Sequence, residues 1–227
     1  MQKSLSSKLV LFDLDGTVID TAPDFVLSLN NILKRHGRAT LKFDHIRSFV
    51  SEGSVKFTEI GFEITRDHPD FNKYRNEFLI EYKNNLTNKS KLFAGISSLL
   101  NQLDENSIPY GIVTNKPFDY AEPLINYFDE LKNCKALVCP DHLQNSKPSP
   151  EGILLACKKI GVDPKESVYV GDHPNDLIAG KNAGTKTIGC LYGYSLDKDE
   201  TYPESIIVNK ADAVSYTHLT LPKTPYV

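Results

Sequence analysis

Short runs of apolar residues recur along the chain, separated by segments of mixed character. The clearest runs are Lys8 to Leu14, Tyr110 to Thr114 and Ser167 to Gly171, and shorter ones are Ala136 to Cys139 and Thr185 to Gly189. Continuous apolar runs of this length are typical of strands that are buried on both faces of a parallel sheet. We therefore predict a set of about five strands.

Helical patterns fill the segments between these strands. Two of the patterns end directly before a glycine, Gly161 or Gly184, which is the residue that helix C-termini favour. Strands that alternate with helices indicate βαβ units, so we predict an α/β fold with an open parallel sheet flanked by helices. The predicted helices are Ile96 to Leu103, Tyr120 to Phe128, Pro150 to Ile160 and Asn175 to Ala183.

The segment between the first two strands is too long for a single crossover connection. Apolar residues repeat in it at helical spacing in two places, and the aromatic repeat of the second is typical of core packing. We predict a small α-helical domain at residues 20–92, inserted into a core made of residues 1–19 and 93–214. The two repeats are Phe25, Leu29, Ile32 and Leu33, then Phe71, Tyr74, Phe78 and Tyr82.

Composition and charge narrow the possible partners. The chain has 26 Lys plus Arg against 29 Asp plus Glu, a formal charge of −3, which argues against binding to nucleic acid or to an anionic membrane. No stretch reaches the roughly 18 to 20 apolar residues of a membrane span. The N-terminal apolar run is interrupted by Asp13 and Asp15, unlike a signal peptide.

Cysteine usage points to a reducing compartment. The four cysteines form no CxxC pair and none has a histidine at zinc-finger spacing. We interpret them as reduced thiols and therefore expect a cytoplasmic protein. As to partners, we expect a small-molecule substrate and either a monomer or a homodimer.

The C-terminal end departs from the pattern of the rest. Ala211 to Val214 suggests a strand, after which residues 215–227 contain two prolines and show no amphipathic period. This tail resembles the translated read-through of a sequencing adapter. We expect that it is not native sequence and that it replaces a closing helix.

A pair of carboxylates directly follows the first predicted strand. Asp13 and Asp15, in the sequence Asp-Leu-Asp-Gly16-Thr17, are two residues apart and point to the same side of the chain. The carboxyl edge of a parallel sheet is where such folds place ligands. A chance match to these four fixed positions has odds of roughly one in a thousand at ordinary residue usage. Turn capping alone does not explain two acids at this place.

A second acidic group follows the third long strand. Asp172 and Asp176 lie four residues apart at a strand-to-helix junction, in Gly171-Asp-His-Pro-Asn-Asp. Together with the first pair they would supply enough carboxylate oxygens for Mg²⁺. Helix N-capping by Asn175 or Asp176 is the alternative, and both interpretations can hold at once for Asp176.

Three polar residues complete the candidate site. Thr114 and Asn115 end the second long strand and can donate a hydroxyl and an amide to a phosphate oxygen. Lys147 precedes a predicted helix and can place a positive charge beside a carboxylate and a phosphoryl group. Each is a weak signal alone, since a lysine before proline is commonly a solvated loop residue.

With these motifs in this order, the sequence resembles the haloacid dehalogenase superfamily of phosphatases from about Lys8 to Val214. The resemblance implies a Rossmann-like core with a helical cap between the first and second motifs, as in the subclass that contains phosphoglycolate phosphatases. Particular stretches resemble bacterial phosphoglycolate phosphatases and N-acetylmuramic acid 6-phosphate phosphatases. They are FDLDGTVIDTAPDF, GIVTNKP, VCPDH, SKP, VGDHPNDLIAGKNAG and LYGY.

The resemblance also implies roles for the motif residues. Asp13 would be the nucleophile that forms an aspartyl-phosphate, and Asp15 the general acid and then the base. Mg²⁺ would be held by Asp13, the backbone carbonyl of Asp15 and Asp172, with Asp176 in support. Thr114 and Lys147 would bind the phosphoryl group and neutralise its charge.

Substrate selection is expected from the inserted domain. In capped relatives a loop closes over the site, and the small residues of Ser51 to Ser54, Gly53 and Ser54 among them, suit such a loop. Lys116, His173 and Tyr192 neighbour the motifs and are further candidates for substrate contact, although a surface position explains each of them equally well.

Three functional alternatives follow from this pattern. The leading prediction is Mg²⁺-dependent hydrolysis of a small phosphate monoester, most simply 2-phosphoglycolate, with N-acetylmuramic acid 6-phosphate as the alternative. A phosphomutase of the same fold and a binding protein without catalysis are the other two. A binding protein without catalysis would be expected to lack at least one of the residues that carry the chemistry. All of them are present: Asp13, Asp15, Thr114, Lys147 and Asp172.

Overall fold

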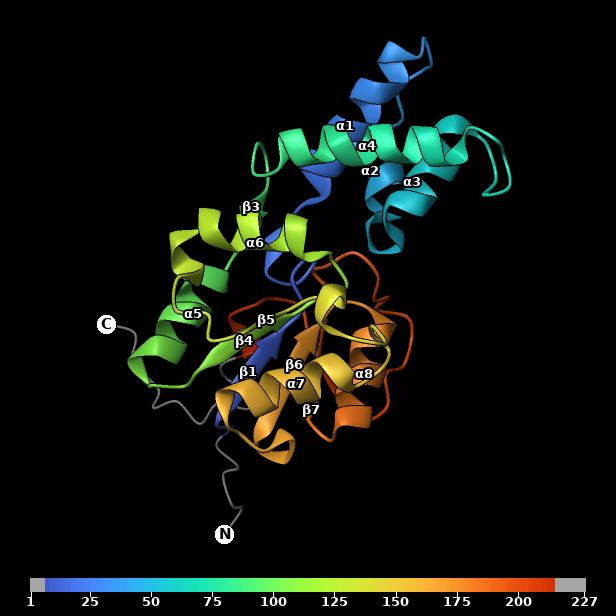
Figure 1. The fold of residues 1–227 in the computed structure, drawn as a ribbon. Helices are drawn as coiled ribbons and strands as arrows, with labels where there is room; N and C mark the ends of the chain where they lie inside the picture. The colour runs from blue at the N-terminus through green and yellow to red at the C-terminus, as the bar shows by residue number, and fades with distance from the viewer. Residues whose placement is uncertain (1–6, 215–227) are drawn as a thin grey trace. The chain divides into compact units, whose positions relative to one another are not determined.

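The computed structural model describes residues 7–214, so our expectation for the tail at 215–227 lies outside the described residues. The chain divides into two compact units (Figure 1). One, here called the core unit, contains the chain up to Val18 and from Leu92 onward. The other, the helical unit, is Ile19–Lys91. Each unit has its own group of buried apolar side chains.

The core unit contains a parallel sheet of the kind predicted, with strand order β5-β4-β1-β6-β7-β8. Adjacent strands pair in parallel throughout this order. Strands β1, β4 and β6 are buried along their whole length, and β7 is buried except at its first residue, which explains their largely apolar sequence. The bounds are β1 (Leu9–Phe12), β4 (Tyr110–Val113), β5 (Leu137–Val138), β6 (Ser167–Gly171), β7 (Lys186–Cys190) and β8 (Ser205–Val208).

The last strand corrects the sequence prediction. We expected a strand at Ala211 to Val214, but Ala211 and Asp212 form a turn and Ala213 and Val214 are helical, with the Val214 N–H donating to the Ala211 carbonyl at 3.1 Å. The strand lies earlier, at β8, where three β-branched residues in succession, Ile206 to Val208, pair with β7. β-Branched side chains favour extended backbone, whereas the alanines after Lys210 do not.

Helices cover both faces of the sheet. Helix α7 (Glu151–Ile160) contacts β1, β4 and β5, and α8 (Pro174–Ala183) contacts β6 and β7 (Figure 1). Right-handed crossovers place α5 (Ile96–Glu105) and α6 (Phe118–Tyr127) on the opposite face. Short 3-10 turns join these elements at Asp129–Leu131, Pro140–His142 and Pro164–Glu166.

The strand order creates a switch point beside β1. From β1 the chain reaches β4 through connections on one face, whereas from β6 it reaches β7 through α8 on the other. Neighbouring strands whose connections diverge in this way leave a crevice at their carboxyl ends, where open α/β sheets bind ligands. Asp13 continues the β1–β6 ladder by donating its N–H to the Val170 carbonyl at 2.8 Å. The sheet thus delivers the ends of β1 and β6 to one place.

The helical unit packs its aromatic residues inward. Phe25 of α1 (Ala22–Arg35) stacks on Tyr82 of α4 (Phe71–Asn85), with ring centroids 4.0 Å apart. Phe57 of α3 (Gly53–Phe62) and Phe78 complete this group and are fully buried. The aromatic repeat therefore serves core packing, as the sequence predicts. Helix α2 (Phe43–Arg47) and the 3-10 turn Val50–Glu52 complete the helices.

A buried carboxylate ties the two ends of the helical unit together. Asp24, in the first turn of α1, is 0% exposed and accepts hydrogen bonds from the Lys89 N–H, the Ser90 N–H and the Ser90 hydroxyl. Beside them, the short strands β2 (Ile19–Asp20) and β3 (Lys91–Leu92) form a two-stranded sheet where the chain leaves and re-enters the core unit. Among the helices of residues 7–214, none has the length and apolar content needed to cross a bilayer.

Candidate active site

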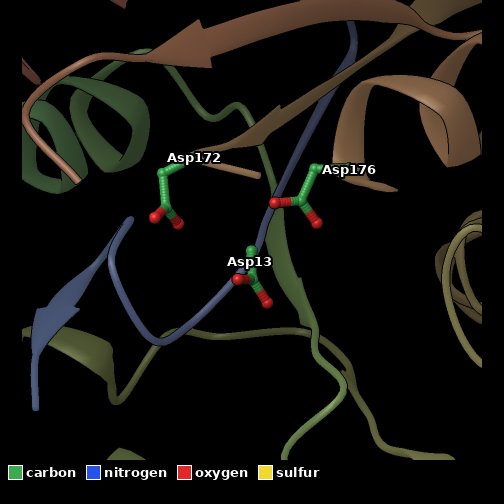
Figure 2. Close-up of side chains that lie close together, drawn as sticks. All are labelled: Asp13, Asp172 and Asp176. Carbon is green, nitrogen blue, oxygen red and sulfur yellow. The ribbon is translucent and has the colours of Figure 1, made fainter. Parts of the chain in front are cut away.

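Three carboxylates meet at the carboxyl ends of β1 and β6. Asp13 directly follows β1, while Asp172 and Asp176 come from the junction between β6 and α8. Figure 2 shows the latter two on either side of Asp13. All three are buried, and each has an oxygen within 4.8 Å of an oxygen of the others. The sheet therefore gathers three acids that are up to 163 positions apart in numbering, from 13 to 176.

The turn after β1 is shaped around Asp172. Gly16 has φ of +86°, and a Cβ there would lie 2.3 Å from the Asp172 carboxylate. The next residue, Thr17, is fully buried and donates its hydroxyl to Asp172 Oδ1 at 2.9 Å. The Gly-Thr pair of the motif thus has a physical purpose that sequence analysis left open: it makes room for the second acid and then binds it.

Lys147 supplies the positive charge at the centre of the cluster. Its Nζ lies 2.7 Å from Asp13 Oδ1 and 2.6 Å from Asp176 Oδ1, and its side chain is 5% exposed. It also donates to the hydroxyl of Tyr169 at 2.9 Å, and that hydroxyl in turn donates to the Val113 carbonyl at 2.8 Å. Lys147 is therefore a buried cation and not a solvated loop residue.

Tyr169 is a site residue that sequence analysis missed. It lies at the middle of β6, is fully buried, and anchors Lys147 to β4 through its hydroxyl. A buried tyrosine hydroxyl requires a polar partner, and this requirement within an otherwise apolar strand was the available signal.

Burial and mutual repulsion shift the protonation of these groups. Burial raises the pKa of Asp13 to about 6, with Lys147 opposing the shift and Asp176 adding to it. Burial, followed by the charges of Asp13 and Asp176, raises the pKa of Asp172 well above its usual range. Burial disfavours the charged form of Lys147, but Asp13 and Asp176 outweigh it and hold the pKa of Lys147 well above its ordinary value. Lys147 contacts Asp13 and Asp176 directly, whereas Asp172 is hydrogen-bonded to Thr17.

Asp15 lies outside the trio and has its own lysine. The Nζ of Lys116 is 3.0 Å from Asp15 Oδ1 and 3.1 Å from Oδ2. The Lys116 side chain is 4% exposed, and that of Asp15 is 19% exposed. Lys116 was one of the candidates for substrate contact, and a surface position does not describe it.

Thr114 and Asn115 both engage neighbouring backbone. The Thr114 hydroxyl oxygen accepts the Lys116 N–H at 3.1 Å, which leaves its own proton for another acceptor. The Asn115 amide donates to the Lys147 carbonyl at 3.1 Å, and its oxygen accepts the Lys147 N–H at 3.1 Å. The amide that we expected on a phosphate oxygen therefore holds the Lys147 backbone.

Helix α8 begins with a reciprocal cap that involves the cluster. His173 is the N-cap residue, and its ring accepts the Asn175 N–H at 3.0 Å. Asp176 accepts the His173 N–H at 3.0 Å through one oxygen and binds Lys147 through the other. Both sequence interpretations of Asp176, capping and membership of the acidic cluster, describe it together.

The segment after β7 closes the far side of Asp172. The Tyr194 N–H donates to Asp172 Oδ2 at 2.8 Å, and the Tyr192 hydroxyl donates to the Thr17 carbonyl at 3.0 Å. Between them, a Cβ on Gly193 would lie 2.2 Å from the Asp172 Cβ. Tyr192 thus supports the turn after β1, and Gly193 allows the backbone to approach Asp172.

If the cluster holds Mg²⁺ for phosphate release, as the sequence predicts, replacing Gly193 with Ala is expected to displace Asp172 and to raise the Mg²⁺ concentration that half-maximal activity requires by about 10- to 100-fold. The measurement is a Mg²⁺ titration of phosphate release. Gly161→Ala, where an added Cβ meets nothing within 4 Å but a φ of +83° strains an alanine, is the control for lost stability and should leave the Mg²⁺ requirement unchanged. Equal Mg²⁺ requirements for Gly193→Ala and the wild type would contradict the role assigned to this glycine.

Gly53 and Ser54 belong to the helical unit. We expected Ser51 to Ser54 to form a loop, but the 3-10 turn Val50–Glu52 and the start of α3 occupy these positions. Gly53 joins the 3-10 turn to α3 with a φ of +70°, a backbone conformation that favours glycine, so the chain changes direction there without a loop. The Ser54 hydroxyl accepts a hydrogen bond from Arg75 Nε at 3.0 Å.

The residues at the acidic cluster fit a hard divalent cation. Their donors are all carboxylate oxygens, which Mg²⁺ prefers, and they are buried close to one another. Burial, with repulsion among the acids adding to it, raises the pKa of Asp13 to about 6 and that of Asp172 well above its usual range, so the negative charge of these acids is costly in the folded protein. A bound cation would relieve this cost.

Comparison with known proteins agrees with this geometry. The family model described as haloacid dehalogenase-like hydrolase matches residues 10–190. An N-acetylmuramic acid 6-phosphate phosphatase of Pseudomonas aeruginosa is 38% identical over 197 residues, which cover 87% of each chain. A phosphoglycolate phosphatase of Xanthomonas campestris is 34% identical over 193 residues, which cover 85% of this chain and 87% of the relative.

A solved structure extends the comparison to the fold. A crystal structure described as that of a predicted phosphoglycolate phosphatase from Haemophilus somnus superposes with a TM-score of 0.81 at 28% sequence identity. The match covers 95% of this chain and 99% of the other.

Proposed function

Since the chain belongs to the haloacid dehalogenase-like hydrolase family, we propose that it is a phosphatase that hydrolyses a small phosphate monoester through an aspartyl-phosphate. One observation carries the proposal: a nucleophilic carboxylate, Asp13, stands at the switch point of the sheet with a buried lysine 2.7 Å away. Such a pairing would bring a nucleophile and a charge-neutralising group to the same phosphoryl group.

In the proposed reaction, an oxygen of Asp13 attacks phosphorus while Asp15 protonates the departing alcohol oxygen. Asp15 then removes a proton from water, which attacks the aspartyl-phosphate and regenerates Asp13 as phosphate leaves. Lys147 holds Asp13 in place and neutralises charge on the transferring group, and Thr114 donates its hydroxyl to a phosphoryl oxygen. Asn115 and Tyr169 position Lys147 through the hydrogen bonds described above.

Mg²⁺ is the proposed cofactor. Asp13, the Asp15 carbonyl and Asp172 would hold it, with Asp176 in support. When bound, it would offset the repulsion between these carboxylates and a phosphate dianion. The fit of the buried oxygen donors supports this assignment.

For the substrate we propose 2-phosphoglycolate, with N-acetylmuramic acid 6-phosphate as the second candidate. The solved structure and several relatives described as phosphoglycolate phosphatases support the first. The higher identity to the Pseudomonas aeruginosa enzyme, 38% against 34%, favours the second. Gly53 and Ser54 of the helical unit are proposed to contribute to this choice. We also propose a cytoplasmic location, consistent with four free cysteines.

Phosphate release from a substrate panel tests the proposal. We expect turnover of 2-phosphoglycolate or N-acetylmuramic acid 6-phosphate in Mg²⁺ and its loss in EDTA, because the acids need a cation to accept a phosphate dianion. Hexose 1-phosphates in the same panel test for a mutase. Absence of phosphate release from every ester, by protein shown to be folded by circular dichroism, would contradict the proposed function.

A further inference from the structure

Asp172 accepts hydrogen bonds from two segments that are far apart in the chain. The Thr17 hydroxyl, in the turn after β1, donates to Asp172 Oδ1 at 2.9 Å. The Tyr194 N–H, in the segment after β7, donates to Asp172 Oδ2 at 2.8 Å. A carboxylate turns easily about its terminal torsion, because the energy wells of that torsion are broad. The direction in which the two oxygens of Asp172 point therefore depends on where these two donors lie.

Residues 191–194, which carry the second donor, form turns and bends and belong to neither a helix nor a strand. Since no regular element sets the course of this segment, side-chain packing must help to hold it. Both of its tyrosines pack against the ring of Phe93. The centroid of that ring lies 5.2 Å from the centroid of Tyr192 and 6.1 Å from that of Tyr194. These distances are typical of favourable aromatic pairs.

Phe93 is also bonded to the turn after β1. It directly follows β3, and its N–H donates to the carbonyl of Val18, the residue after Thr17, at 3.0 Å. The Tyr192 hydroxyl donates to the Thr17 carbonyl at 3.0 Å and so joins the same turn to the segment after β7. All of these residues belong to the core unit. Phe93 therefore bridges the two parts of the chain that hold the two oxygens of Asp172.

We propose that Phe93 is a positioning residue for the cation site: by holding residues 191–194 against the turn after β1, it orients the Asp172 carboxylate for Mg²⁺ binding. The inference rests on the proposed Mg²⁺ site and deepens it by naming a residue outside the sequence motifs that sets the affinity of the site. Removing a partner that orients a metal ligand typically weakens metal binding about 10- to 100-fold. Phe93 acts through two such partners, Thr17 and Tyr194.

Mg²⁺ binding in the absence of substrate tests the proposal. Phe93→Ala removes both ring contacts, whereas Phe93→Tyr keeps them. Phe128→Ala is the matched control, because Phe128 is likewise a half-buried phenylalanine of the core unit. Isothermal titration calorimetry gives the Mg²⁺ dissociation constant, at a temperature at which each metal-free variant is shown to be folded. We expect Phe93→Ala to raise this constant about tenfold, and Phe93→Tyr and Phe128→Ala to leave it close to the wild-type value.

Hydrogen exchange on the wild type provides a second measurement that depends on no variant. Because coupling between sites is reciprocal, a cation that holds Asp172 in place should also steady the residue that orients it. We expect saturating Mg²⁺ to slow exchange of the Phe93 N–H about fivefold or more relative to the Gly161 N–H. The Gly161 N–H, which donates to the Cys157 carbonyl at 2.8 Å at the end of α7, reports the general stabilisation of the core unit.

An unchanged Mg²⁺ dissociation constant in folded Phe93→Ala would overturn the inference, and so would equal slowing of exchange at Phe93 and Gly161. A similar loss of Mg²⁺ affinity in Phe128→Ala would overturn it too, since the effect would then come from general destabilisation. Failure of the proposed function is distinguishable from these outcomes. A folded wild type whose Mg²⁺ affinity depends on Phe93 but which releases phosphate from no ester would support the inference and contradict the hydrolysis. A wild type that binds no Mg²⁺ would overturn the inference together with the proposed cofactor.

Discussion

Replacing Asp13 with Asn is expected to lower kcat by about 10⁴-fold or more, whichever ester is the best substrate. The amide keeps the shape of the side chain but is not a nucleophile, so no aspartyl-phosphate can form. Phosphate release at saturating substrate and Mg²⁺ measures the effect. Asp129→Asn, at an exposed aspartate of the core unit, is the control and should leave kcat unchanged.

Stability distinguishes this loss of chemistry from a loss of folding. Burial raises the pKa of Asp13 from 3.8 to about 6, so between these values the folded state binds more protons than the unfolded state. The free energy of unfolding therefore falls as pH rises through this window, and the penalty is fully present at pH 7 without metal. Asp13→Asn removes this penalty, so the metal-free variant should unfold at a higher temperature than the wild type.

For the catalytic test, an Asp13→Asn variant that retains more than about one hundredth of the wild-type kcat would contradict the assignment of Asp13 as the nucleophile.

Replacing Lys147 with Met is expected to lower the free energy of unfolding by about 3 to 5 kcal/mol at pH 7 without metal, and to abolish turnover. The ammonium lies 2.7 Å from Asp13 and 2.6 Å from Asp176, and both acids stay buried when it is removed. Burial opposes the charge of Lys147, but Asp13 and Asp176 raise the pKa of Lys147 well above its ordinary value, so the folded state favours the charged form. Chemical denaturation measures the stability.

Two further measurements isolate the electrostatic cause. Lys159→Met, at an exposed lysine of α7, should change stability by less than about 0.5 kcal/mol. Because protonation discharges the acids that Lys147 leaves behind, the deficit of Lys147→Met should shrink as the pH is lowered toward 4. A deficit that is the same at pH 4 and pH 7 would indicate lost packing instead of uncompensated charge.

Most of the core could be predicted because its strands are buried on both faces. Such strands have continuous apolar sequence, and the alternation with helices then determines the parallel sheet. Strand β8 was missed because only Ile206 to Val208 are β-branched and the segment before them is irregular. Burial there depends on β7, which lies 15 or more residues earlier in the chain, from Ser205 to Cys190.

The site was predictable where a residue type alone implies its chemistry. Asp13, Asp172, Asp176 and Lys147 fall together because the carboxyl ends of parallel strands share one edge. The contacts of Thr17 and Gly193 with Asp172 could not be read from local sequence, since they join residues that are distant along the chain. The pairing of Lys116 with Asp15 depends on side-chain direction, which sequence spacing does not specify.

The pairing of β2 with β3 brings the two ends of the helical unit together. Ile19–Asp20 and Lys91–Leu92 are hydrogen-bonded neighbours, so the chain leaves the core unit and returns to it at adjacent points. An insertion with adjacent ends can lengthen, shrink or be exchanged for another without altering the spacing of the strands on either side. The acids of the core unit can therefore keep their positions when the inserted segment changes in sequence or length.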